Sequence, residues 1–321
     1  MVLDRPFRIE FEISSLCNAL CSGCQRTMMD NRGKYYYKGN ITIDQMTDWF
    51  DEVDLTNAKI KLCGVLGDPI VNPDCYEICS YLMLEKKVKS IEISTNGGMR
   101  SSKFWTQLGE LSAMSGNRLY VHWSIDGVTK NDYRENVNID KVWENFHTYY
   151  NAGGKCIWQY IHFDYNADEI PLAKQKAKEL GVELKIRVSW RNTADAAKFK
   201  SSEALKIDED IYETVETRAR TGDYEAANIV CRHQLENELF VTSEGRIWPC
   251  CHLQDEQVAG KTDILTKVGL KNDLQQSKFY DIIQSEWYEK TLAESWEKSH
   301  PLHLPRCYLS CGDFAKRKVI K

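Results

Sequence analysis

The sequence Phe7-Arg-Ile-Glu-Phe-Glu-Ile13-Ser-Ser-Leu-Cys17-Asn-Ala-Leu-Cys21-Ser-Gly-Cys24 joins a strand pattern directly to three closely spaced cysteines. Apolar and polar side chains alternate from Phe7 to Ile13, which is typical of a β-strand. The cysteines have the spacing C-x3-C-x2-C, so three thiolates can bind one small inorganic cluster. A [4Fe–4S] cluster held by three cysteines leaves one iron open to another ligand. The alternatives are a zinc site completed from elsewhere in the chain, or three unrelated buried thiols.

Strand-like and helix-like segments alternate through the first two-thirds of the chain. Further strand patterns cover residues 59–63, 90–94, 119–125, 156–163 and 183–189, and helical patterns cover about 42–53, 74–87, 101–111, 140–152, 168–180 and 201–220. This alternation predicts a parallel sheet with helices outside it. Eight units close a full barrel, so six predict an open, partial (β/α)6 barrel whose chemistry lies on the loops after the strands. The segment between the first strand and Thr42 reads as a long polar loop.

The pattern changes from Cys231 onward. Residues 238–242 and 246–248, joined by Ser243-Glu244-Gly245, predict a β-hairpin with a glycine turn. Four spaced cysteines accompany it: Cys231, Cys250, Cys307 and Cys311. We therefore expect an α/β barrel over residues 1–195, a helical connection over 196–230 and a small α+β domain over 231–321.

Composition narrows the class of protein. The 42 Lys and Arg against 47 Asp and Glu give a net charge of −5, which lacks the basic footprint of a nucleic-acid-binding protein. The sequence shows no apolar run of membrane-spanning length and no apolar signal core near residue 1. Twelve cysteines are too few for a disulfide-built scaffold of 321 residues. We expect a soluble cytoplasmic protein, because cysteine clusters in a reducing compartment generally bind metals or act in catalysis.

The C-x3-C-x2-C motif after the first strand of a partial barrel resembles that of the radical S-adenosylmethionine (SAM) enzymes. The resemblance implies a [4Fe–4S] cluster on Cys17, Cys21 and Cys24, with SAM chelating the open iron. It also implies reductive cleavage of SAM to a 5′-deoxyadenosyl radical that abstracts a hydrogen atom from a substrate. Many members have an aromatic residue before the third cysteine, where this chain has Gly23. Packing against the adenine is therefore expected from another part of the chain.

Motifs at three further strand ends extend the resemblance. Gly64-Val-Leu-Gly67-Asp68-Pro69 is similar to the element that holds the SAM amino group, with Asp68 in place of the usual glutamate. Ser94-Thr-Asn96-Gly97 resembles a loop common in the family, and Ser124-Ile-Asp126-Gly127 with Arg134 resembles the segment that contacts the SAM ribose and carboxylate. The SAM contacts implied in this way are Gly67, Asp68, Asn96, Ser124, Asp126 and Arg134.

The four cysteines of the last third resemble those of the twitch domain, a shortened form of the SPASM extension of this family. The resemblance implies a second [4Fe–4S] cluster, fully ligated by Cys231, Cys250, Cys307 and Cys311, that transfers electrons. Cys251 is an alternative to Cys250, because adjacent side chains of an extended chain point to opposite faces. A zinc site with four cysteine ligands is the other alternative.

The expected function is a radical SAM reaction that oxidises or rearranges a small molecule such as a sugar or nucleotide. Because the first strand begins at residue 7, we expect no N-terminal peptide-binding module, although a peptide- or protein-modifying enzyme is the alternative. A non-catalytic zinc or iron–sulfur protein is the alternative of another class. Flavodoxin or ferredoxin is the expected reductant. Candidate catalytic or substrate-contacting residues are Cys63, Cys156, Arg187, Trp190 and Arg191.

Overall fold

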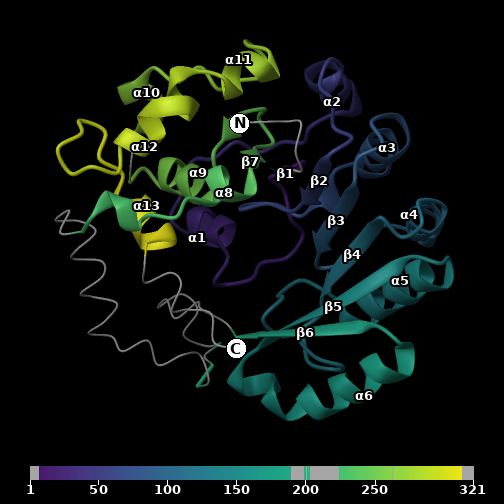
Figure 1. The fold of residues 1–321 in the computed structure, drawn as a ribbon. Coiled ribbons are helices and arrows are strands. Elements are labelled where there is room, and N and C mark those ends of the chain that lie inside the picture. The colour runs from purple at the N-terminus through teal and green to yellow at the C-terminus, as the bar shows by residue number, and fades with distance from the viewer. Residues whose placement is uncertain (1–6, 189–198, 200, 203–223, 262, 313–321) are drawn as a thin grey trace.

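The computed structural model describes residues 7–188, 199, 201–202, 224–261 and 263–312. Their strands form one eight-stranded sheet in the order β6-β5-β4-β3-β2-β1-β7-β8 (Figure 1). The strand bounds are β1 Phe7–Phe11, β2 Ala58–Leu62, β3 Ser90–Thr95, β4 Leu119–Ser124, β5 Lys155–His162, β6 Glu183–Val188, β7 Glu238–Val241 and β8 Ile247–Trp248. Neighbouring strands from β6 to β7 are parallel, and β8 pairs antiparallel with β7. The predicted parallel α/β architecture is confirmed.

Helices cover the convex side of the sheet (Figure 1). They include α2 Ile43–Phe50, α3 Cys75–Ser80 with a π-helical turn Tyr81–Glu85, α4 Ser102–Met114, α5 Ile139–Asn151 and α6 Ile170–Leu180. The predicted capping box of α2 is present, because Thr42 accepts from the Gln45 amide and Gln45 accepts from the Thr42 amide. Gly181 ends α6 in the left-handed conformation. No helix of the described residues is long and apolar enough to cross a membrane.

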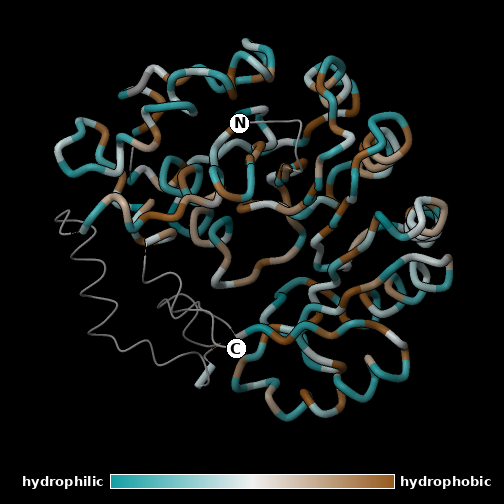
Figure 2. The backbone as a smooth tube through the Cα atoms, in the orientation of Figure 1, coloured by the Kyte–Doolittle hydropathy of each residue, from teal (hydrophilic) through white to brown (hydrophobic). Residues whose placement is uncertain are grey.

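The two faces of the sheet differ in polarity. On the convex side, Phe11, Leu62, Ile93 and Trp123 are completely buried against the helices. The strand residues that alternate with these point to the concave face and are mostly polar. Apolar and polar segments alternate along this part of the chain (Figure 2). The concave face is therefore not a second hydrophobic core.

Two features of the fold differ from the sequence-based expectation. The segment predicted to be a long polar loop contains a helix, α1 (Gln25–Asn31), which begins directly after Cys24. The predicted hairpin is present, but its first strand, β7, pairs in parallel with β1 and extends the barrel sheet. The helix predicted over 201–220 falls almost entirely outside the described residues.

The remaining helices surround the end of the sheet formed by β7 and β8 (Figure 1). Their bounds are α8 Arg232–Glu236, α9 Cys251–Val258, α10 Ile264–Val268, α11 Phe279–Ile283, α12 Leu292–Glu294 and α13 Pro305–Cys311. Contacts between α9 and α13 bring residues near 250 beside residues near 307. This arrangement gathers the late cysteines in one place.

Candidate active site

The loop after β1 brings Cys17, Cys21 and Cys24 together at the C-terminal end of the strand. The backbone N–H of Cys24 donates to the Cys21 carbonyl at 3.0 Å, and Cys24 is the N-cap of α1. Cys21 is buried and the other two cysteines are half-buried. The three thiols of this loop therefore lie at the edge of the sheet where the parallel strands end, as predicted.

Polar groups converge on the Cys17 sulfur. The backbone N–H of Ala19 donates to it at 3.4 Å, and the Asn96 side-chain amide lies 3.7 Å from it. Burial, together with the nearby Asp68 carboxylate and the Cys21 thiol, raises the pKa of Cys17 to about 12. A thiol with such a pKa ionises only beside a strong positive charge, such as that of a metal centre.

The spacing of these groups does not match a single metal ion. Among the described residues, no three His, Cys, Asp or Glu side chains converge closely enough to hold one. A four-iron cluster binds each thiolate on a different iron atom, so it holds the sulfur atoms farther apart than one ion does. The three thiols and the amides beside Cys17 thus fit a [4Fe–4S] cluster in residue type and in donor chemistry.

Asp68 and Asn96, both predicted SAM contacts, are bonded to each other. The Asp68 Oδ2 atom accepts from the backbone N–H and the side-chain amide of Asn96, both at 2.8 Å. Its Oδ1 atom accepts from the Ile70 backbone N–H at 3.2 Å. The Asn96 amide also donates to Asn18 at 2.9 Å. Asp68 therefore orients Asn96 against the cysteine loop.

Gly67 lies against the chain that leads from β1 to Cys17. A Cβ atom at Gly67 would fall 1.8 Å from the Ser14 carbonyl oxygen, so only glycine fits here without a backbone shift. The next residue, Asp68, donates its backbone N–H to the Leu16 carbonyl at 2.9 Å. The loop after β2 is therefore held in contact with the segment that carries the cysteines.

Asp126 and Arg134 form a buried ion pair after β4. The Arg134 Nε atom lies 3.0 Å from Asp126 Oδ2, and its guanidinium also donates to Oδ1 at 3.2 Å. Asp126 is completely buried and accepts from the Ile161 backbone N–H at 3.1 Å. Against the effect of burial, the Asp126 carboxylate and the Cys21 thiol raise the pKa of Arg134, so both lie within electrostatic range of the guanidinium. Ser124 ends β4 nearby and is half-buried.

Two acidic residues collect backbone amides from the loops of this site. Glu12 accepts from Leu66 in the loop after β2 at 2.7 Å. Glu169 accepts from the amides of Val128 at 2.7 Å, Thr129 at 3.1 Å and Lys130 at 3.2 Å in the loop after β4. Sequence reasoning missed Glu12, because a polar residue in an alternating strand carries no signal of a partner more than fifty positions away.

The concave face of the barrel carries a polar belt, formed by Glu10, Lys61, Glu92, His122, Gln159 and Lys185 from six successive strands. Lys61 Nζ lies 3.0 Å from Glu10 Oε1, and His122 Nδ1 lies 3.6 Å from Glu92 Oε1. Lys61 and Glu92 keep 26% and 20% of their side-chain exposure although they lie in the middle of the sheet. Water therefore reaches the concave face of the sheet.

The candidate catalytic residues do not all lie on the same face of the sheet. Cys63 continues the concave side of β2, and burial raises its pKa to about 11. Cys156 is 6% exposed and packs in the convex hydrophobic core, so it is not retained as a candidate. Arg187 is exposed near the end of β6. Trp190 and Arg191 lie outside the described residues.

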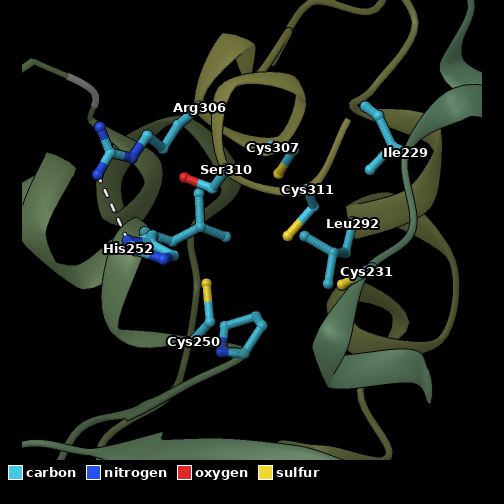
Figure 3. Close-up of a pocket in the computed structure, with 11 residues that line it drawn as sticks. Ile229, Cys231, Cys250, His252, Leu292, Arg306, Cys307, Ser310 and Cys311 are labelled. Atoms are coloured by element: carbon cyan, nitrogen blue, oxygen red, sulfur yellow. Dashed lines mark hydrogen bonds between the residues drawn. The ribbon is translucent and has the colours of Figure 1, made fainter. Parts of the chain in front are cut away.

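The four late cysteines surround one cavity (Figure 3). Cys231 and Cys250 are the N-caps of α8 and α9, whereas Cys307 and Cys311 come from α13. Burial raises the pKa of Cys250 to about 12, with Cys231 and Cys311 adding to the effect, and the backbone amides of Leu253 and His252 oppose it. Each thiol thus lies within electrostatic range of others in the set. The residue types fit a cluster closed by four cysteines.

Cys251 does not line this cavity. Burial raises its pKa, and the next largest influences are Glu10, Cys250 and Lys61. Cys251 thus lies within electrostatic range of Glu10 and Lys61 of the polar belt. Of the two adjacent thiols, Cys250 is the one that shares a cavity with the other three.

Comparisons with known proteins agree with this geometry. A family model described as the radical SAM superfamily matches residues 11–174. No curated protein matches the chain. The fold is similar to Streptococcus suis SuiB bound to S-adenosylmethionine, with a TM-score of 0.56, 15% identity, and coverage of 94% of this chain and 68% of SuiB. It is also similar to anSMEcpe with bound AdoMet, with a TM-score of 0.56, 14% identity, and coverage of 95% and 91%.

BtrN in complex with AdoMet and 2-DOIA matches with a TM-score of 0.46 and 13% identity, over 94% of this chain and 91% of BtrN. At these identities the likenesses to SuiB and anSMEcpe show a shared fold. The family match spans half of the chain and includes the three-cysteine loop and the loops after β2, β3 and β4. The chain therefore belongs to the radical SAM superfamily.

Proposed function

We propose that this protein is a radical SAM enzyme with two [4Fe–4S] clusters that oxidises a polar small molecule. The observation that carries the proposal is the separation of seven cysteines into a set of three in the loop after β1 and a set of four around one cavity. When bound, the clusters and SAM would supply reductive SAM cleavage, hydrogen-atom abstraction and removal of one electron from the substrate. The remaining steps fall to side chains of this chain.

Cys17, Cys21 and Cys24 would hold the open cluster, and the loops around them would orient SAM. Asn96 lies beside Cys17, and Asp68 fixes its direction. Arg134, fixed by Asp126, lies near Cys21 and is suited to the SAM carboxylate. The aromatic residue missing at Gly23 has a nearby substitute in Tyr133, Phe163 and Phe199, which pack with the three cysteines in one cluster of side chains.

Cys231, Cys250, Cys307 and Cys311 would hold the closed cluster. Apolar side chains enclose them, since Ile229, Trp296 and Tyr308 form a buried group that packs against three of the four cysteines. Four thiolate ligands leave no iron free for a substrate, so electron transfer is the role that suits this site. An electron released by the substrate would leave through it.

The polar belt of the barrel suits a substrate that carries hydroxyl or amino groups. Loss of a hydrogen atom, then of one electron and one proton, converts an alcohol carbon to a carbonyl. His122 is suited to accept that proton. Glu92 Oε1 lies 3.6 Å from the Nδ1 atom of His122, and burial lowers the pKa of His122 so that the ring is neutral near pH 7.

A peptide substrate is the second candidate. Related folds include SuiB bound to the precursor peptide SuiA, with a TM-score of 0.54, and anSMEcpe with a Cp18Cys peptide, also with a TM-score of 0.54. The two candidates differ in what the belt must contact: the termini and side chains of a peptide, or the substituents of a small molecule.

We further propose that the enzyme works in the reducing cytoplasm with flavodoxin or ferredoxin as its electron donor. None of the twelve cysteines, all of which lie in the described part of the chain, forms a disulfide in the structure, and cluster assembly requires thiols.

The test is anaerobic incubation of the reconstituted protein with SAM and dithionite, followed by measurement of 5′-deoxyadenosine. The proposal predicts its formation, and none from protein with intact clusters would contradict it. Metal analysis separates the alternative class, because two cubane clusters give about eight iron atoms per chain. About four iron atoms with stoichiometric zinc would instead assign zinc to the second site.

A further inference from the structure

Glu12 lies directly beneath the loop after β2, which carries Gly67 and Asp68. Its Oε1 atom accepts from the Leu66 backbone N–H at 2.7 Å, and the amides of Val65 and Gly67 also face the carboxylate. The residue is 1% exposed. A Cβ atom at Gly64 would come within 2.7 Å of the same Oε1 atom. The loop is thus folded around one buried carboxylate.

We propose that Glu12 is a positioning residue for SAM, whose ionised carboxylate holds residues 64–67 in the conformation that binds the SAM amino group. The inference rests on the proposed function, because it assigns a task to the loop that the SAM site would use. Glu12 would not touch SAM. It would act through the three backbone amides, which fix the backbone of Gly67 against Ser14.

The ionisation of Glu12 falls near neutral pH. Burial raises its pKa to about 7, the amides of Leu66, Gly67 and Val65 lower it, and the neighbouring Glu10 carboxylate on the same face of β1 raises it. From the loop after β2, the groups that face Glu12 are these amides. Above this pKa the carboxylate accepts charge-assisted hydrogen bonds, which are stronger than those of the neutral acid.

Stability and SAM binding are therefore expected to respond to pH with opposite signs. Because the native pKa is raised above its ordinary value of 4.5, ionisation costs folding free energy, and this cost grows as pH rises from about 4.5 through 7. The same ionisation orders the loop and strengthens SAM binding. A carboxylate with a merely structural role would not improve binding while it destabilises the fold.

Glu169 provides the matched comparison. It also collects three successive backbone amides, from the loop after β4, but the hydroxyl and amide of Thr129 and the neighbouring amides hold its pKa below its usual value, against the effect of burial. It is ionised throughout the neutral range. Its effect on SAM binding is therefore expected to be independent of pH, in contrast to that of Glu12.

The experiment measures the calorimetric Kd for SAM of the reconstituted wild type, Glu12→Gln and Glu169→Gln at about one pH unit below and above pH 7. Both proteins share any effect that comes from titration of SAM itself. Beyond the change seen in Glu12→Gln, wild type should therefore bind SAM about fivefold more weakly at the lower pH. Glu169→Gln should lose affinity by the same factor at both pH values. Equal pH ratios in wild type and Glu12→Gln would overturn the inference.

A second measurement needs no variant. Hydrogen exchange of the Val65, Leu66 and Gly67 amides in the wild type, corrected for intrinsic rates, should show protection that increases as Glu12 ionises. Protection that stays constant across the same range would overturn the inference while leaving the proposed function intact. If wild type with intact clusters bound no SAM, the proposed function and this inference would both fail.

Discussion

The two cysteine sets share aromatic neighbours but differ in the polar groups beside them. Around Cys17, the neighbours are polar groups that already orient one another, such as Asn96 and Asp68. Around Cys307, the neighbours are apolar, including Trp296 and Tyr308. A site that must admit SAM needs groups which hold a polar ligand, whereas a site that only passes electrons is best shielded from water. The contrast supports an open and a closed cluster.

Removing a ligand of the first set should have the largest effect. Cys17→Ala, Cys21→Ala or Cys24→Ala should each abolish 5′-deoxyadenosine formation, because three thiolates are the minimum that holds the cluster with one open iron. The product is measured by chromatography after anaerobic incubation with SAM and dithionite. Cys75→Ala removes a buried thiol from α3 and should retain product formation. Formation of 5′-deoxyadenosine by all three variants would contradict the assignment of these cysteines as cluster ligands.

The second set should lose one cluster when Cys250 is replaced. In Cys250→Ala the iron content should fall from about eight to about four atoms per chain, while the first cluster remains. The adjacent Cys251→Ala is the control, because Cys251 does not line the cavity that Cys250 shares with the other three cysteines. Iron loss in Cys251→Ala with none in Cys250→Ala would reverse the assignment of the two thiols.

The polar groups near the first cysteine set can be changed without replacing a cysteine. Arg134→Met leaves the completely buried Asp126 carboxylate without its ion-pair partner. We expect the free energy of unfolding to fall by about 3–5 kcal/mol, the usual cost of an unpaired buried charge. Denaturant titration of the holoprotein measures it.

Lys38→Met is the control for that loss, because it breaks the exposed pair with Asp30, whose side chains keep 56% and 34% exposure. The expected loss there is much smaller, because solvent screens an exposed ion pair. Similar losses in both variants would show that the pair after β4 is not specially buried.

The smallest expected effect comes from adding one methyl group at Gly67. Gly67→Ala places a Cβ atom against the Ser14 carbonyl and forces a backbone shift, so SAM affinity should fall about tenfold at a folding cost of about 1–3 kcal/mol. Gly116→Ala is the control. It has a positive φ of 66° but open space around it, so it should cost about 1 kcal/mol and leave SAM affinity unchanged. Calorimetry with SAM distinguishes the two variants.

The parallel sheet was predictable because each strand pattern is local and each is followed by a helical pattern. Helix α1 was not, since its N-cap Cys24 makes no side-chain capping bond and its residues show no apolar stripe. Its Met29 instead packs against Tyr36 and Leu66 from other segments. The pairing of β7 with β1 was also hidden, because it joins residues more than two hundred positions apart.

The candidate site was predictable in its motifs and not in its contacts. The cysteine spacing and the loops containing Gly67, Asn96 and Asp126 were identifiable by sequence alone. The bonding of Asp68 to Asn96 depends on how two loops meet in space. The choice between Cys250 and Cys251 depends on where α9 begins, which the adjacent cysteines do not reveal.

The central claim is that one cluster is open to SAM and the other is closed. Electron paramagnetic resonance of the dithionite-reduced protein, recorded with and without SAM, tests it most directly. The account predicts signals from two clusters, of which SAM changes one and leaves the other unaltered. A single cluster signal, or two signals that both remain unaltered when SAM is added, would contradict it.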